Sequence, residues 1–168
     1  MAATRAELFV RLTGLGIETT TVDHEAVFTV GESSGLERDL PGGHTKNLFL
    51  KDGKDRLFLV TAESHTAIDL KSLPKRLGCA RLSFGKPELM MEVLGITPGS
   101  VTAFSLINDT AGRVTFVLDA ALMAHDSINC HPLTNTATTN IARDDLLRFI
   151  RATGHEPHII PFSDGPIV

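Results

Sequence analysis

The chain has 168 residues, of which 42% are hydrophobic and 21% charged, and its formal net charge is −4. This composition is typical of a globular protein, and the length predicts a single domain over residues 1–168. No run approaches the roughly eighteen apolar residues of a membrane span, so we expect a soluble, cytoplasmic protein without a membrane partner. The negative total argues against a general DNA-binding protein, because Lys and Arg supply most non-specific affinity for phosphates.

The charge is distributed unevenly along the chain. Residues 46–86 contain nine basic and four acidic residues and therefore carry +5, which leaves −9 for the rest. Two interpretations stay open at this point. The segment is either a solvated face balanced by acids elsewhere or a docking surface for a polyanion.

The first forty residues predict two helices and a strand. Thr4 and Glu7 form a capping-box pattern ahead of leucines at helical spacing, so a helix begins there and ends at Gly14–Gly16. Residues 18–24 are rich in β-branched side chains and predict a short strand. Residues 31–39 predict a short helix, which ends at a "PGG" turn.

Two apolar runs in residues 44–62 predict the clearest hairpin in the chain, with its turn at Asp52-Gly53. Alternation along the first strand places Lys46 on the same face as Leu48 and Leu50. A lysine on an apolar face either extends its amine to solvent at a sheet edge or lines a pocket. In a pocket it would bind a phosphate or stabilise developing negative charge.

The middle of the chain predicts helices over 68–78 and 86–95, each closed by a glycine, with a strand at 80–84 between them. Pro98-Gly99 suits a type II turn, which we expect to lead into a strand. Residues 113–122 predict another strand, central in the sheet.

The last part of the chain predicts two short strands within 125–142, on either side of a turn at 132–135. A helix over 143–154 and a terminal strand at 158–162 follow. Strands joined by tight turns, with helices inserted irregularly, favour an α+β fold with a curved, mixed or largely antiparallel sheet.

The chemistry-bearing motifs outside the hairpin are weak when taken singly. The turn in "TPGSVTAF" would let backbone amides approach a ligand, but most such turns only connect elements. His131 and Asn135 in "HPLTN" could place a donor and an acceptor at a pocket rim, although a structural histidine is commoner. The histidines lack metal-binding spacing, and Cys130 and His131, as neighbours on a strand, would face opposite ways, so we predict no metal site and no thiol nucleophile.

Taken together and in order, "LPGGHTKNLFLKD", "LGITPGSVTAFSLIND" and "CHPLTNTATT" resemble the motifs of the YbaK/ProX family of aminoacyl-tRNA deacylases, and in particular its free-standing ProX (PrdX) members. Those members clear alanine that has been attached by mistake to proline tRNA. The resemblance implies a strongly curved, barrel-like mixed sheet with surrounding helices and a pocket at its mouth. It also implies an enzyme that needs no cofactor, with the acceptor end of an aminoacyl-tRNA as its partner and prolyl-tRNA synthetase as a possible second one.

The resemblance also implies roles for residues. Lys46 corresponds to the family's essential lysine, while Gly99 and Ser100 belong to its glycine loop, which positions the ester and the attacking water. The remaining positions are expected to bind substrate: Asn47, Val101, Thr102, Ala103, His131 and Asn135. Many members have proline at the position of Ala103, whereas Lys51, on the opposite strand face, is expected to be dispensable.

Three functions are compatible with this sequence. The first is hydrolysis of alanyl-tRNA for proline, with the terminal 2′-hydroxyl of the substrate assisting the water. The second is the same chemistry on tRNA carrying serine or cysteine. The third is a module that binds tRNA or a synthetase without turnover.

Overall fold

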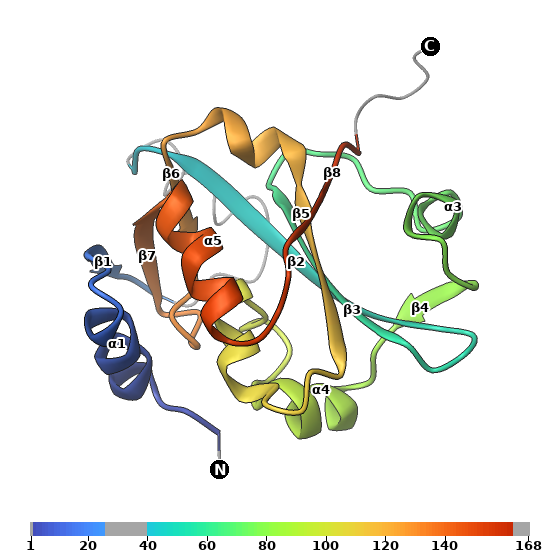
Figure 1. The fold of residues 1–168 in the computed structure, drawn as a ribbon, viewed down its shortest axis with the longest axis horizontal. Coiled ribbons are helices and arrows are strands. Elements are labelled where there is room, and N and C mark those ends of the chain that lie inside the picture. Colours follow the sequence, from blue (N-terminus) through green and yellow to red (C-terminus); the bar gives the residue numbers. More distant parts are fainter. Residues whose placement is uncertain (1, 26–39, 163–168) are drawn as a thin grey trace.

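The computed structural model describes residues 2–25 and 40–162, which form a sheet flanked by helices (Figure 1). The helices in these residues are α1 (Arg5–Gly14), α3 (Leu73–Leu77), α4 (Pro87–Leu94), α5 (Arg143–Ala152) and the 3-10 helices η1 (Ala103–Asn108) and η2 (Ala120–Ala124). The strands are β1 (Thr19–Asp23), β2 (Gly43–Asp52), β3 (Leu57–Glu63), β4 (Leu82–Phe84), β5 (Val114–Asp119), β6 (Ser127–Cys130), β7 (Ala137–Ala142) and β8 (His158–Ile160). Within this part of the chain no helix is both long and apolar enough to span a bilayer.

The strands form one mixed sheet in the order β1-β7-β6-β2-β3-β5-β8, and β4 pairs with β2 beside this path. The predicted α+β class with a mixed sheet and surrounding helices is therefore confirmed. The sheet does not close into a barrel, because β1 and β8 form its two ends and are not paired with each other in the described residues.

β2 is the strand around which the sheet is organised. On one side it pairs with β3 over residues 45–51. On the other side it pairs in parallel with β6 through Gly43 and His44, and in antiparallel fashion with β4 through residues 50–52. Between these two pairings the edge of β2 has no strand partner in the described part of the chain, so the sheet has an opening there.

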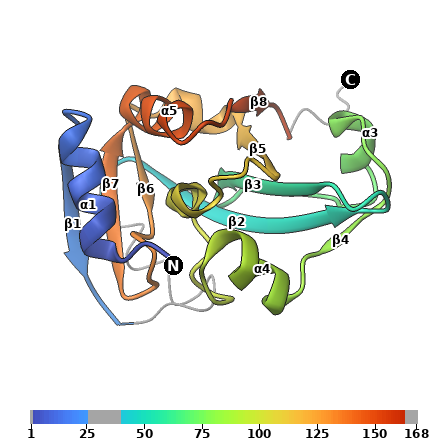
Figure 2. The same ribbon diagram turned by 60° about the horizontal axis from the view of Figure 1, so that its bottom comes forward.

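The two faces of the hairpin carry separate hydrophobic clusters. Phe49 and Leu59 face the larger cluster, to which α1, α4, α5 and η1 contribute buried side chains. Leu50 and Val60 face the smaller cluster, which is covered by α3 and the residues around it. Figure 2 shows α1 beside β1 and α3 on the far side of the molecule, near the tip of the β2–β3 hairpin.

Several predicted elements are confirmed. The hydroxyl of Thr4 accepts from the N–H of Glu7 and the Glu7 side chain accepts from the N–H of Thr4, so α1 begins with the expected capping box. The strand at 18–24, the hairpin, α4, the two strands around 132–135, α5 and β8 lie where the sequence predicts them. The helix predicted for residues 31–39 falls outside the described residues.

Two predicted elements need correction. The residues after Pro98-Gly99 do not form a strand but the 3-10 helix η1, because Thr102 caps the N–H of Phe104 and its carbonyl accepts from the Ser105 hydroxyl. The helix predicted for 68–78 is limited to Leu73–Leu77, which begins next to Pro74. In both places local side-chain and proline chemistry overrides the apolar pattern.

Asp52 closes the hairpin turn and joins it to the start of β4. The side chain is almost fully buried and accepts hydrogen bonds from the backbone N–H groups of Lys54, Arg56 and Ala80. Burial alone would raise the pKa of Asp52, but these bonds and the guanidinium of Arg56 lower it to about 2.

This carboxylate should make stability depend on pH. The folded pKa of about 2 lies below the ordinary value of 3.8, so the stabilisation is present above about pH 4 and is lost as the pH falls towards 2. We expect Asp52→Asn to lower the urea midpoint at pH 7 and to flatten its decline between these pH values. The exposed Asp55→Asn is the matched control, and an unchanged acid limb in Asp52→Asn would contradict the assignment.

Candidate functional site

The start of β2 is fixed by two asparagine side chains from β6 and β7. Asn129 donates from Nδ2 to the carbonyl oxygens of Pro41 at 2.8 Å and Gly43 at 3.2 Å. Asn140 donates from Nδ2 to Oδ1 of Asn129 at 3.1 Å and to the Pro41 carbonyl at 3.3 Å. These bonds hold in place the backbone that leads to Lys46.

Lys46 lies on the face of β2 that is opposite to the main core. Its partner on β3 is Ala62, and strand alternation places it with Leu48 and Leu50, which belong to the smaller cluster. This agrees with the predicted alternation. The lysine is half-buried, and its side chain has no hydrogen bond or ion pair with any residue that the structure describes. A half-buried cation without a protein anion is available to a negatively charged or carbonyl-bearing ligand.

Lys46 and His131 stand where two parallel strands separate. His44 is paired with Asn129, and Lys46 and His131 each follow that pair by two residues, Lys46 within β2 and His131 directly after the last residue of β6. Alternation continued past the end of β6 would put both on the face of that pair. β6 ends at Cys130, whereas β2 continues towards β4, so the two strands diverge (Figure 1). We call this place, defined by Lys46 and His131, the fork.

His131 presents a neutral imidazole at the fork. Its Nδ1 lies 3.2 Å from the carbonyl oxygen of Ala137, which can only accept, so Nδ1 carries the proton and donates. Burial lowers the pKa of His131, the bond to Ala137 opposes this, and the nearby His24 lowers it further. The neutral ring therefore keeps Nε2 free to accept a hydrogen bond from a ligand.

Asn47 faces the main core rather than the fork. The hydroxyl of Thr61 donates to Oδ1 of Asn47 at 2.6 Å, and Thr61 is fully buried. Asn47 shares the strand face of Phe49, opposite to that of Lys46. The role of Asn47 in binding substrate stays a prediction. Asn47 would reach the substrate at the part of the β2 edge that has no strand partner.

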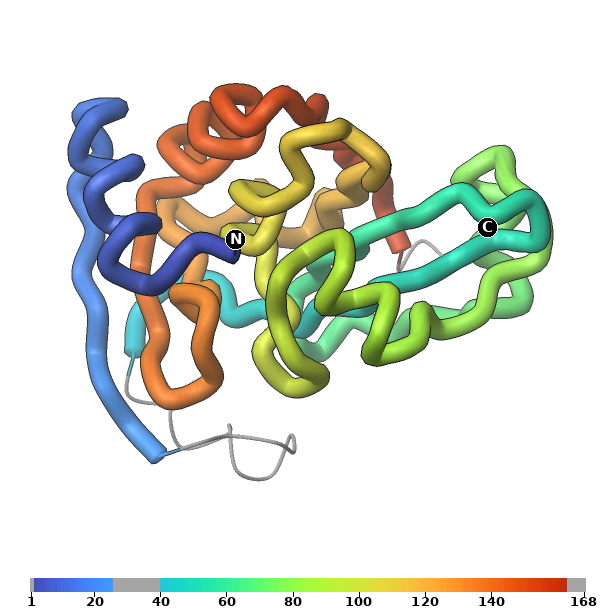
Figure 3. The backbone as a smooth tube through the Cα atoms, turned by 90° about the horizontal axis from the view of Figure 1, so that it is seen from below, coloured from blue at the N-terminus to red at the C-terminus, as the bar shows by residue number. Residues whose placement is uncertain are grey.

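The turn before η1 has the predicted geometry. The N–H of Ser100 donates to the Thr97 carbonyl at 3.1 Å, and Gly99 has a φ of +93°, as the third position of a type II turn requires. In the described residues no hydrogen bond joins this turn to Lys46 or His131. The segment that follows α4 lies near the β6–β7 turn in Figures 2 and 3.

The rest of the loop offers backbone rather than side chains. Thr102 and Ala103 are fully buried, and the Thr102 hydroxyl caps η1 by accepting from the N–H of Phe104 at 3.3 Å. Val101 is half-buried against the main cluster. The predicted substrate contacts of these residues can therefore arise chiefly through peptide groups.

The β6–β7 turn holds the last predicted site residue. Asn135 is half-buried, and its side chain makes no hydrogen bond with the residues described. Leu133 in the same turn has a φ of +68° and packs against the main cluster. The turn thus leaves an amide group uncommitted a few residues beyond His131.

Other catalytic chemistry finds little support near the fork. Burial raises the pKa of the Cys130 thiol to about 12, so the thiol is protonated at neutral pH and is a poor nucleophile. Within residues 2–25 and 40–162 no group of three or more His, Cys, Asp or Glu side chains could hold a metal ion. The fork itself offers the cation of Lys46, the neutral acceptor of His131 and backbone groups.

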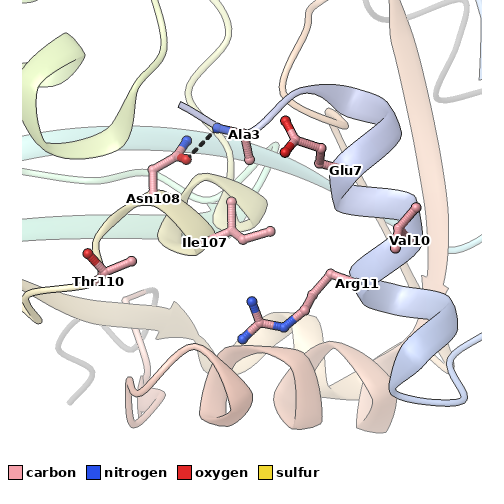
Figure 4. Close-up of a pocket in the computed structure, with 7 residues that line it drawn as sticks. All are labelled: Ala3, Glu7, Val10, Arg11, Ile107, Asn108 and Thr110. Atoms are coloured by element: carbon pink, nitrogen blue, oxygen red, sulfur yellow. Dashed lines mark hydrogen bonds between the residues drawn. The ribbon is translucent and has the colours of Figure 1, made fainter. Parts of the chain in front are cut away.

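Neither of two hollows in the described residues is lined by Lys46 or His131. A hollow of about 150 Å³ lies on the outer face of the sheet and is lined by Thr20, Val22, Leu40, Pro41, Asn129, Thr138 and Asn140. A larger hollow of about 650 Å³ lies between α1 and η1 and contains none of the predicted site residues (Figure 4). The volume of a hollow therefore does not identify the position of Lys46.

Sequence reasoning missed the polar residues that support the fork. Asn129 and Asn140 fix the start of β2, and Thr138 lies 2.8 Å from Nε2 of His24 through its hydroxyl. Alternation on the predicted strand before His131 would have placed Asn129 on the face of His131. No signal in the sequence links Asn140 or His24 to the fork, because those contacts join distant strands.

Comparison with known proteins adds independent findings. A family model for the aminoacyl-tRNA editing domain matches residues 24–149. The chain is similar to prolyl-tRNA synthetase associated domain-containing protein 1 of Danio rerio, with 44% identity over 161 residues, which cover 95% of this chain and 88% of that protein. It is also similar to the prolyl-tRNA editing protein ProX of Acetoanaerobium sticklandii, with 33% identity over 146 residues, 86% of this chain and 89% of that protein.

The fold also has a solved counterpart. The crystal structure of a proposed trans-editing enzyme for prolyl tRNA synthetase matches with a TM-score of 0.72 and 19% identity, covering 98% of this chain and 100% of that one. At this identity the match supports the fold alone.

Gly42 tests the anchoring of β2. It has a φ of +95°, and a Cβ there would lie 2.5 Å from Oγ and 2.8 Å from the carbonyl oxygen of Ser127. We expect Gly42→Ala to lower the free energy of unfolding by about 1–3 kcal/mol, measured by urea denaturation. Gly14→Ala, where nothing lies within 4 Å of the added carbon, is the control. Equal stability of the two variants would refute the tight approach of β2 to β6.

Proposed function

The chain belongs to the family of aminoacyl-tRNA editing domains, and we propose that its substrate is proline tRNA that carries alanine by mistake. As a member of this family it is an aminoacyl-tRNA deacylase, which hydrolyses the ester between an amino acid and its tRNA. The proposal for alanine is supported by the similarity to the ProX protein and by the three motifs that resemble the ProX members.

The observation that carries the proposal is the unpaired cation at the fork. The side chain of Lys46 is half-buried and has no hydrogen bond or ion pair in the described residues, and the neutral His131 directly follows β6, the strand that pairs with the start of β2. An aminoacyl ester at the end of a tRNA offers a phosphate and a carbonyl to a cation, and an amino group to an acceptor nitrogen. We assign to Lys46 the ribose and phosphate region together with the negative charge that develops there in the transition state, and to Nε2 of His131 the amino group.

The reaction needs positioning more than a strong nucleophile. Water adds to the ester carbonyl carbon, the bond from that carbon to the ribose oxygen breaks, and the ribose hydroxyl and free amino acid leave. The neighbouring 2′-hydroxyl of the substrate assists the water, and backbone groups of the Gly99–Ala103 loop hold the ester. Fixed geometry and preorganised charge supply the rate enhancement.

The need for such an enzyme follows from the limits of size discrimination. One methylene in an apolar pocket is worth only about 1–3 kcal/mol, and a site built for proline cannot exclude the smaller alanine by size. A second site that admits alanine but not proline removes the error and spares the correct product.

A panel of purified alanyl-, seryl-, cysteinyl- and prolyl-tRNA tests the substrate. We expect release of alanine from proline tRNA and no release of proline. Faster release of serine or cysteine would move the activity to another misacylated tRNA. Release from none of the four would favour a module that binds tRNA or prolyl-tRNA synthetase without turnover.

Removal of the cation tests the role of Lys46. Loss of one preorganised oxyanion donor costs about 2.7–4 kcal/mol in other enzymes, or about 10²–10³-fold in rate. We expect Lys46→Ala to lower the single-turnover rate on alanyl-tRNA by a similar factor at saturating enzyme.

Lys51→Ala is the matched control, because Lys51 lies on the other strand face and pairs with Asp55 at 3.5 Å. It should retain the wild-type rate. A Lys46→Ala protein that also keeps a near-normal rate would refute the assignment.

The neutral state of His131 predicts a pH dependence. Because burial lowers the pKa of His131 below the ordinary value of 6.5, the ring loses its acceptor nitrogen only below that pH. The enzymatic rate, corrected for spontaneous hydrolysis, should fall as the pH drops through this pKa, and His131→Gln should abolish the inflection. An inflection of the same size in both proteins would show that another group titrates.

A further inference from the structure

Unpaired exposed cations gather at one end of the molecule. The tip of the β2–β3 hairpin, α3 and β4 lie together at that end (Figures 1 and 3). Five basic side chains there are exposed and have no hydrogen bond or ion pair with the residues described; we call them the basic surface: Lys54, Lys71, Lys75, Arg81 and Lys86.

The acidic residues of the same segment cancel only part of this charge. Asp52 is buried and lies 3.0 Å from Arg56, and Asp55 lies 3.5 Å from Lys51. The other two acids accept hydrogen bonds from backbone N–H groups: Glu63 and Asp69. Residues 51–86 hold eight basic and four acidic residues, so they keep +4 in a chain of net charge −4. Such a local field attracts a polyanion.

An exposed aromatic ring lies among these cations. Phe84 is 62% exposed, whereas the other phenylalanines of the described residues are buried or half-buried. It belongs to the short edge strand β4, between Arg81 and Lys86 in the sequence. A basic surface that includes an exposed ring is the combination with which proteins bind single-stranded nucleic acid.

The basic surface and the fork are connected by β2. Phe84 is paired with Leu50, and directly opposite residues of antiparallel strands share a face, so Phe84 lies on the sheet face of Lys46. Leu50 is four residues from Lys46, or about 13 Å along the strand. That separation is short enough for a few nucleotides to span.

We propose that the basic surface binds phosphates of the acceptor arm of tRNA and that Phe84 stacks on an unpaired base near its 3′ end. This rests on the proposed function, because it assumes that the terminal ester occupies the fork. β2 then sets the distance between the ester at the fork and the tRNA phosphates on the basic surface. The positive charge of residues 46–86 is then a docking surface for a polyanion rather than a solvated face.

The test removes three cations and leaves the fork intact. For Lys75→Gln, Arg81→Gln and Lys86→Gln combined, we expect the Kd for uncharged tRNA to rise at least about tenfold at about 0.1 M salt. The slope of log K against log salt should fall by about 2 to 3, since each lost phosphate contact removes roughly 0.7–0.9. The single-turnover rate at saturating enzyme should not change.

The matched control combines Arg113→Gln, Arg148→Gln and Arg151→Gln. These side chains are 46%, 53% and 54% exposed and lie outside the basic surface. Equal weakening by both triple variants would reduce the effect to net charge and overturn the proposal. An unchanged Kd of the Lys75, Arg81 and Lys86 variant for tRNA would also overturn the proposal. The same holds if that variant keeps its affinity for tRNA but loses affinity for prolyl-tRNA synthetase.

Uncharged tRNA keeps the two proposals separable. A protein that binds tRNA with the expected salt slope but releases no amino acid would refute the proposed function and support the basic surface. If the wild type and the triple variant hydrolyse alanyl-tRNA at the same rate at limiting enzyme, the result would support the proposed function and refute the basic surface.

Phe84 is tested separately from charge. Phe84→Ala should weaken binding of tRNA by about five- to hundredfold, the range for loss of one stacked base, with the salt slope unchanged. Phe84→Tyr keeps an aromatic face and should bind as the wild type does. Wild-type affinity in Phe84→Ala would overturn the stacking contact.

Discussion

The candidate site depends on a parallel pairing of β2 with β6 that extends over only two residues. Gly43 and His44 are paired with Ile128 and Asn129, and the strands then separate. Side-chain amides hold this short pairing, since Asn129 donates to two carbonyls of the chain that enters β2. A longer pairing would close the edge of β2, whereas the register of Lys46 itself is set by its pairing with Ala62 on β3.

The electrostatics of the fork follow from that constraint. Removal of a lysine from water is unfavourable unless a partner or access to solvent remains. Lys46 is only half-buried, and its side chain has no protein anion as a partner in the described residues. His131 is more strongly desolvated, which lowers its pKa and keeps it neutral. A free cation beside a neutral acceptor suits a substrate that brings its own activated ester and hydroxyl groups.

Much of this arrangement could be predicted where the information is local. The capping box of α1, the hairpin and the turn at Gly99 follow from short-range chemistry, as does the strand face of Lys46. The open sheet could not be predicted from the sequence, because it depends on which strands pair. The 3-10 helix at Ala103–Asn108 could not be predicted either, because it depends on the hydrogen bond that the Thr102 hydroxyl accepts from the N–H of Phe104. The amide network of Asn129 and Asn140 could not be predicted, since these residues are 88 and 99 positions away from Pro41, whose carbonyl they bind.

The central claim is that Lys46 and His131 act on one bound ester at the fork, and a double-mutant cycle on single-turnover hydrolysis of alanyl-tRNA tests it most directly. Residues that act on the same substrate give effects that are not additive. The account predicts that Lys46→Ala combined with His131→Ala loses clearly less than the product of the two single losses. Losses that multiply exactly, as for two independent sites, would contradict it.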